Sequence, residues 1–374
     1  MSDKKMRIAV VELNPRHDEL FPTWLHLANR KDYCIDFFVS PMHEARDIFS
    51  VSESPKPKCF LTSSPDLGDS IFMKILKRIY TNILRLRSLL LLRIRYDLVI
   101  ANSVERENNY WHFFHYLNKP MLAVLHNSNL LVANKAFNHL RGKRSISVLV
   151  LSKHIQAYLA QHEIASYPVY AISGLRKAFR GGRANEELTF CVQGNIDFHR
   201  RNYDSLLKAA SQLKKEKVRC NFRMVGGFNR SASIMQSRIA ELGISDYFTF
   251  VSDAESYQDY YKAICDCRFL LFLIDDTRMI YRPFFEDKCT SSLIVALALG
   301  VIPVVNNGLA NTYGIAGCSV LYEADDVYSG IRSALSFESK RVDSLANSLE
   351  QVRQQLAEIS DNEFDKAITS AIDR

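Results

Sequence analysis

Short apolar runs alternate with longer amphipathic segments along most of the chain. In the first half, the runs cover 7–13, 34–39, 97–101, 121–125 and 147–151. After a basic stretch, they resume at 188–193, 221–225, 248–251, 268–274, 301–305 and 319–322. Continuous apolar strands that alternate with helical segments predict parallel sheets covered by helices on both faces.

The apolar runs are too numerous for one compact parallel sheet in a chain of 374 residues, and the length also favours two domains. We therefore expect a first domain at 1–173, a linker at 174–187, a second domain at 188–337 and terminal helices at 338–374. The predicted fold class is α/β, with two doubly wound, Rossmann-like domains that face a cleft. In such sheets, ligands bind beyond the carboxyl ends of the strands.

Composition excludes several classes of protein. The chain is 47% apolar and 24% charged, which is typical of a globular protein. Its 8 cysteines show no paired metal-binding spacing, so we expect reduced thiols. The first apolar run is too short for a signal peptide, and no run reaches membrane-spanning length, which favours a cytoplasmic protein. The net charge of +7 suits an acidic partner without identifying it.

Glycines and arginines follow two of the predicted strands. Gly194 ends one strand, and Arg200 and Arg201 come just before the next helix. A glycine lets a ligand approach the backbone, and arginines near a helix N-terminus bind phosphate oxygens. Gly226 and Gly227 follow the neighbouring strand in the same way. The alternatives are a solvated basic loop and a tight turn.

The strongest motif precedes an apolar helix that ends at Gly300. It consists of a lysine and three consecutive hydroxyl residues: Lys288, Thr290, Ser291 and Ser292. One hydroxyl is enough to cap a helix, whereas a lysine and three hydroxyls at the positive end of the helix dipole favour binding of a diphosphate.

The order of these motifs resembles the donor half of GT-B glycosyltransferases, and it is closest to the large family-4 (group 1) set. The likeness covers roughly 188–330 well and the first half only in outline. The resemblance implies a metal-independent glycosyltransferase that binds a nucleotide-sugar donor. It also implies that Arg201 contacts the phosphates, and that the loop from Lys288 to Ser292 holds the diphosphate and ribose.

One departure from this family concerns two glutamates spaced eight positions apart. The corresponding residues here are Asp287 and Val295, and a valine cannot accept hydrogen bonds from a ribose. The Ser-Ser pair is similar to bacterial sialyltransferases that use a CMP-linked donor. The sequence therefore favours a UDP- or GDP-linked donor, keeps a CMP-linked donor as an alternative, and leaves the retaining or inverting outcome open. The donor is a substrate, and no cofactor is expected.

Two adjacent carboxylates, Asp275 and Asp276, follow another strand of the donor half. Such a pair suits Mg²⁺, but the resemblance implies that Arg, Lys and helix ends neutralise the donor instead. Arg278, Tyr281 and Arg282 lie nearby in sequence. We count Asp275 and Arg282 among the candidate donor contacts, with a surface loop as the alternative.

Candidate acid–base residues follow two strands of the first half. His17 and Asp18 come shortly after the first strand, and His126 ends another. Histidine is a suitable general base because transfer requires an acceptor hydroxyl to lose its proton. The resemblance places a histidine at the position of His126 near the transferred sugar. The alternative is a buried histidine with a structural hydrogen bond.

Residues 74–95 contain seven basic and no acidic residues among many leucines and isoleucines. Coiled as a helix, the segment suits an anionic membrane surface at the inner face of the membrane, or else packs on the sheet.

We expect transfer of a sugar to a saccharide, lipid-linked or other hydroxyl acceptor in surface polysaccharide or glycoconjugate synthesis, without a nucleic-acid partner. The alternatives are a sugar-nucleotide epimerase and a non-catalytic GT-B-like scaffold that binds sugar.

Overall fold

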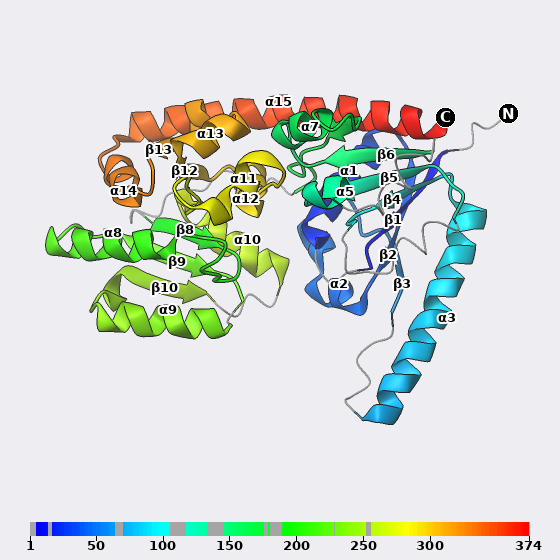
Figure 1. Ribbon diagram of the computed structural model, residues 1–374, viewed down its shortest axis with the longest axis horizontal. Helices are drawn as coiled ribbons and strands as arrows, with labels where there is room; N and C mark the ends of the chain where they lie inside the picture. Colours follow the sequence, from blue (N-terminus) through cyan, green and yellow to red (C-terminus); the bar gives the residue numbers. More distant parts are fainter. Residues whose placement is uncertain are drawn as a thin grey trace. The chain divides into compact units, whose positions relative to one another are not determined.

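A computed structural model describes residues 5–13, 17–63, 70–104, 117–133, 145–175, 179, 189–227, 229–251 and 256–373. The chain divides into two compact units (Figure 1). Unit 1 comprises Met1–Leu175 and Ala357–Arg374, and unit 2 comprises Arg176–Leu356. Most of the predicted linker, 176–178 and 180–187, lies outside the described residues.

Unit 1 contains a parallel sheet in the order β3-β2-β1-β4-β5-β6-β7. Its strands are β1 (Arg7–Val11), β2 (Cys34–Val39), β3 (Lys58–Leu61), β4 (Leu98–Ala101), β5 (Met121–Leu125), β6 (Ile146–Val150) and β7 (Ser166–Pro168). The chain leaves β1 toward β2 on one side and returns to β4 on the other. The point between β1 and β4 is therefore the topological switch point, where doubly wound sheets bind ligands.

The helices of unit 1 are α1 (Phe21–Arg30), α2 (Pro41–Arg46), α3 (Ile71–Arg95), α5 (Asn129–Ala133) and α7 (Lys153–Ala160), with short 3₁₀ turns η1 (Asp18–Leu20) and η2 (Ile48–Val51). The end of the long helix α15 (Ser339–Ile372) belongs to this unit from Ala357 onward. Its Ser360 hydroxyl accepts a 2.9 Å hydrogen bond from the Tyr170 amide, and Phe364 stacks on Trp24. These contacts attach the end of α15 to the core of unit 1.

Unit 2 contains a second parallel sheet in the order β10-β9-β8-β11-β12-β13. Its strands are β8 (Thr189–Gln193), β9 (Asn221–Val225), β10 (Phe248–Val251), β11 (Phe269–Leu271), β12 (Ile302–Asn306) and β13 (Val320–Tyr322). The switch point of this sheet lies between β8 and β11.

The helices of unit 2 are α8 (Tyr203–Lys215), α9 (Arg230–Glu241), α10 (Tyr257–Cys265), α11 (Pro283–Glu286), α12 (Ser291–Leu299), α13 (Asn307–Tyr313) and α14 (Val327–Leu335), with 3₁₀ turns η5 (Ser245–Tyr247), η6 (Met279–Tyr281) and η7 (Ala316–Cys318). Helices α8, α9 and α14 pack in one core with Phe190, Phe222 and Phe269 of the sheet. Helix α12 is buried at every position after Ser291, which explains its uniformly apolar sequence.

The structure confirms the predicted α/β class, with two parallel sheets and surrounding helices. The sequence pattern missed β3 and β7. Both are edge strands, and edge strands tolerate charge and proline because one side of their backbone is not paired. Lys58 of β3 is exposed, and β7 ends at Pro168.

Helix α3 exposes a continuous apolar stripe. Nine large side chains on one face are exposed: Phe72, Ile75, Leu76, Ile79, Tyr80, Ile83, Leu86, Leu90 and Ile94. At 3.6 residues per turn, they span an arc of about 140°. Leu84, Ser88 and Leu92 are buried on the opposite face. The helix therefore packs on unit 1 through a narrow strip in its C-terminal half, and its N-terminal half extends beyond the strands of that unit (Figure 1).

Candidate functional site

The candidate donor site of unit 2 begins where β8 and β9 end. Gly194 has a φ of 87°, a left-handed conformation that favours glycine, and its amide donates a 2.7 Å hydrogen bond to the Val225 carbonyl. A Cβ on Gly226 would lie 2.4 Å from the Gly194 carbonyl oxygen. The Gly227 amide donates to the Asn195 side chain at 3.0 Å. These glycines bring two loops into direct backbone contact beside the switch point.

Arg201 is a buried cation in this region. Its side chain comes from the loop between Gly194 and α8, and the residue is 7% exposed. One guanidinium nitrogen donates to the Ser292 hydroxyl at 3.3 Å, and Nε is buried without a hydrogen-bond partner. Among the residues that the structure describes, no carboxylate lies within ion-pair distance of it. A buried cation is costly unless an anion compensates it, so the arrangement calls for an anionic ligand.

The three hydroxyls at the start of α12 have different roles. Thr290 is the N-cap, and its hydroxyl accepts a 3.3 Å hydrogen bond from the Ser292 amide. The buried Tyr313 hydroxyl accepts from the Thr290 amide at 3.2 Å and donates to the Phe284 carbonyl at 3.1 Å, which fixes the preceding turn. Ser292 is fully buried, whereas Ser291 is exposed. Only Ser291 therefore presents its hydroxyl at the surface.

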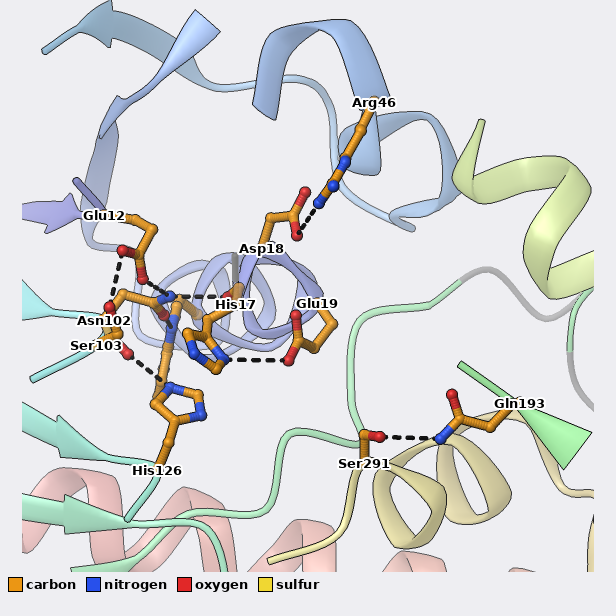
Figure 2. Close-up of polar contacts among 11 residues, drawn as sticks. Glu12, His17, Asp18, Glu19, Arg46, Asn102, Ser103, His126, Gln193 and Ser291 are labelled. Atoms are coloured by element: carbon orange, nitrogen blue, oxygen red, sulfur yellow. Dashed lines mark hydrogen bonds and ion pairs between the residues drawn. The ribbon is translucent and has the colours of Figure 1, made fainter. Parts of the chain in front are cut away.

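Gln193, at the carboxyl end of β8, joins the two serines and was not among the predicted site residues. Its Nε2 donates to the Ser291 hydroxyl at 2.9 Å and to the Ser292 hydroxyl at 3.1 Å (Figure 2 shows the first of these bonds). Its Oε1 accepts from the Tyr260 hydroxyl at 2.6 Å. A polar amide that ends an otherwise apolar strand is the sequence signal that could have identified it.

Several predicted donor residues have partners within the protein. Arg200 is exposed and lies 3.3 Å from Asp197. Arg282 is also exposed and lies 2.6 Å from Glu286. The Lys288 ammonium lies 5.1 Å from the centre of the Phe284 ring. Exposed ion pairs contribute little to stability, so Arg200 and Arg282 can change partners at little cost.

Asp275 is buried, whereas Asp276, the second carboxylate of the predicted pair, is exposed. Asp275 accepts a 2.9 Å hydrogen bond from the Asn202 side chain and further bonds from the amide and hydroxyl of Thr277, which accounts for its burial structurally. Asp287 and Val295, at the two glutamate positions of the family, are also buried. No group of three or more His, Cys, Asp or Glu side chains in the described ranges is placed to hold a metal ion.

In unit 1, the structure brings His17 and His126 together. Their ring centres are 3.7 Å apart at the switch-point edge of the sheet (Figure 2). His126 follows β5, and its Nε2 lies 3.0 Å from the Asn102 carbonyl oxygen after β4. His17 has a φ of 66°, an uncommon backbone conformation for a residue other than glycine. Such strain concentrates at functional sites.

Asp18, the candidate acid–base residue next to His17, faces a different part of unit 1. Asp18 is buried, and its carboxylate points toward Arg46 at 3.7 Å (Figure 2). Glu19 pairs with His17 instead, with 3.6 Å between His17 Nδ1 and the carboxylate. Burial raises the pKa of Glu19, but the hydrogen bond from His17 and the charges of His17 and His126 outweigh it and lower the pKa to about 2.

A second carboxylate fixes the backbone around the histidines. Glu12, 1% exposed at the end of β1, accepts hydrogen bonds of 2.8 Å from the Asn102 side chain and from the Ser103 hydroxyl. The side-chain amide nitrogen of Asn102 also donates to the backbone carbonyl of His17 at 2.8 Å. The Trp24 indole nitrogen donates to the side-chain oxygen of Asn102 at 2.6 Å. This network joins β1, β4 and α1 and holds His17 in place.

Solved structures share the fold, although no protein-family model and no curated protein matches this sequence. Anabaena HepE in complex with UDP-glucose matches with a TM-score of 0.66 and 12% identity, over 96% of this chain and 99% of that chain. A glycosyltransferase from Rickettsia africae matches with a TM-score of 0.62 and 11% identity, over 99% of both chains. The lipopolysaccharide outer core galactosyltransferase WaaB matches with a TM-score of 0.54 and 15% identity, over 98% of this chain and 99% of that chain.

These likenesses cover nearly the whole chain, and they show that it has the GT-B fold. Membership of family 4 in particular stays a prediction.

Proposed function

We propose that this protein transfers a sugar from a nucleotide-sugar donor to a hydroxyl acceptor. The observation that carries this proposal is the uncompensated Arg201 guanidinium beside the N-terminus of α12. A cation and an exposed hydroxyl at the positive end of a helix dipole together suit a diphosphate. The proposal is supported by the match to HepE bound to UDP-glucose and by the matches to a glycosyltransferase and a galactosyltransferase.

In this proposal, unit 2 binds the nucleotide-sugar donor, and unit 1 provides the base that accepts the proton of the acceptor hydroxyl. The acceptor oxygen forms a bond to the anomeric carbon as the bond from that carbon to the diphosphate breaks. His17 takes the acceptor proton, Glu19 stabilises the resulting imidazolium, and His126 contacts the sugar. Arg201, Ser291 and the positive end of the α12 dipole stabilise the charge on the departing diphosphate, and Lys288 adds a further positive charge. No metal ion or cofactor is invoked.

A thermal-shift screen with UDP, GDP, ADP and CMP and their sugars tests the donor part of the proposal. We expect one nucleotide to raise the melting temperature, with UDP or GDP favoured over CMP. The Arg201→Met variant should lose this shift. If no nucleotide stabilises the wild-type protein, the proposal fails and the non-catalytic scaffold is favoured.

The epimerase alternative is tested by product analysis. A transferase forms a new glycoside only when an acceptor hydroxyl is supplied, whereas an epimerase converts the nucleotide sugar without one. An altered nucleotide sugar in the absence of acceptor would contradict the proposal. Saccharide and lipid-linked acceptors should be compared, because synthesis of surface polysaccharide or another glycoconjugate remains part of the proposal.

We also propose that α3 lies on an anionic membrane surface. Its apolar stripe extends from Phe72 to Ile94 on the side away from Leu84 and Leu92. The helix contains seven basic and no acidic residues, so two copies of it would repel each other, whereas anionic lipid would attract each one. No described helix has the length and apolarity needed to cross a membrane. The proposal is therefore a helix parallel to the surface.

Vesicle co-sedimentation tests this second proposal. Binding should require anionic lipid, weaken with salt, and fall at least about tenfold when Ile79 and Ile83 are replaced by serine, since each buried side chain contributes more than 1 kcal/mol. Ile234→Ser, at an isolated exposed position of α9, is the matched control. Equal binding of both variants, or dimerisation without vesicle binding, would contradict the proposal.

A further inference from the structure

Five side chains of unit 2 are joined by directed hydrogen bonds that converge on the start of α12. The Tyr260 hydroxyl donates to Gln193 Oε1 at 2.6 Å. Gln193 Nε2 donates to the Ser291 and Ser292 hydroxyls at 2.9 and 3.1 Å. Arg201 donates to the same Ser292 oxygen at 3.3 Å. The chain thus links α10, β8 and α12 to the buried cation.

The direction of these bonds determines what Ser291 can offer a ligand. A serine hydroxyl has one hydrogen to donate and two lone pairs that accept. Because the Gln193 amide group donates, it occupies a lone pair of each serine and keeps their hydrogens pointed away from it. The Tyr260 hydroxyl holds the amide in this orientation, since it donates to the oxygen and leaves the nitrogen facing the serines.

The two serines therefore have different roles, one toward Arg201 and one toward the ligand. Ser292 is fully buried and accepts from both Gln193 and Arg201, so it fixes the guanidinium. Ser291 is exposed at the first position of α12, where the positive end of the helix dipole attracts an anion. With one lone pair occupied by Gln193, its hydrogen is directed toward the ligand side.

We propose that Gln193 is a positioning residue that sets Ser291 as a hydrogen-bond donor to the diphosphate of the donor substrate, with Tyr260 fixing the Gln193 amide. This inference rests on the proposed function, because the ligand is the same diphosphate. It adds that the side-chain amide of Gln193 determines the direction in which the Ser291 hydroxyl donates its hydrogen. An acidic side chain at this position would reverse that direction.

The test measures UDP affinity by calorimetry in the full-length chain. Gln193→Glu should weaken binding about 100-fold, because a carboxylate can only accept and draws the serine hydrogens inward, and because it adds a negative charge. Gln193→Leu should weaken binding about tenfold, and Tyr260→Phe by a smaller factor. Gln212→Leu, at an exposed glutamine of α8, should have no effect.

A double-mutant cycle separates positioning from general damage to the fold. In a Ser291→Ala/Ser292→Ala background, Gln193→Leu should cause no further loss of UDP affinity. An equal tenfold loss in both backgrounds would overturn the inference, as would Gln193→Glu binding UDP like the wild type. If the wild-type protein binds no nucleoside diphosphate at all, the proposed function itself fails, and that result is distinct from either outcome.

Discussion

The carboxyl edges of the two sheets carry different chemistry on the same architectural plan. In unit 1, the edge beside the switch point of β1 and β4 holds two histidines in ring contact and Glu19. In unit 2, the edge beside the switch point of β8 and β11 holds Arg201, an amide and hydroxyls. One edge therefore carries side chains that can accept a proton, whereas the other presents a fixed positive charge.

Under the proposed function, this difference assigns proton transfer and stabilisation of the diphosphate to different units. Proton transfer needs a group whose charge changes, and stabilisation of a departing diphosphate needs charge and donors that stay constant. We expect changes in unit 1 to alter rate and pH dependence, and changes in unit 2 to alter donor affinity.

The largest effect should come from His17. Its replacement by glutamine should lower kcat by about 10²–10⁴, the usual contribution of a general base, because the ring that accepts the proton is lost. The affinity for the nucleotide should stay unchanged, as measured by calorimetry. His162→Gln, at an exposed histidine of unit 1, is the control. A change in nucleotide affinity as large as the loss of rate would contradict the separation of roles.

Arg201 should show the opposite pattern. Arg201→Met should weaken UDP binding by about 100-fold, because a charged hydrogen-bond donor to the diphosphate is lost. The melting temperature of the ligand-free protein should not fall, since the change removes a buried cation that has no carboxylate partner in the described residues. A less stable variant that binds UDP normally would show that Arg201 is structural. Thermal unfolding with and without UDP measures both effects.

The sequence predicted only part of the difference between the carboxyl edges of the two sheets. The central strands could be predicted because burial on both faces makes them continuously apolar, as in 121–125 and 221–225. Gly194 and the hydroxyls from Thr290 to Ser292 were also identified, because backbone approach and helix starts require particular residue types.

Pairing between neighbouring residues could not be predicted in the same way. Asp18 and Glu19 both follow His17, and the turn η1 decides that Glu19 faces the ring while Asp18 faces Arg46. Gln193 depends on contacts with Tyr260 and Ser291, which are distant in sequence. Such choices arise from tertiary packing, which local pattern does not encode.

A smaller effect is expected at Glu19. Glu19→Gln should lower kcat by about tenfold and shift the pH dependence of the rate, because the carboxylate that stabilises protonated His17 is lost. The folded-state pKa of Glu19 is about 2, below the ordinary value of 4.5. Its contribution to stability is therefore complete above about pH 4.5 and is lost as the pH falls toward 2.

Urea unfolding at several pH values measures the second consequence. The wild type should be more stable than Glu19→Gln by on the order of 2–3 kcal/mol near pH 5, and the gap should close toward pH 2. Glu163→Gln, at an exposed position after α7, is the matched control. A stability gap independent of pH would mean that Glu19 does not pair with His17 in solution.

The smallest effect is expected at Arg200, and it sharpens the comparison within unit 2. Arg200 and Arg201 are adjacent and equally charged, but Arg200 is exposed beside Asp197 while Arg201 is buried beside Ser292. Water and salt screen an exposed charge, so Arg200→Ala should change UDP affinity and stability by less than about 0.5 kcal/mol. Raising the salt concentration should weaken UDP binding to the wild type and to Arg200→Ala equally. If Arg200→Ala instead weakened binding as strongly as Arg201→Met, donor affinity would depend on the total positive charge of the loop and not on the one buried guanidinium.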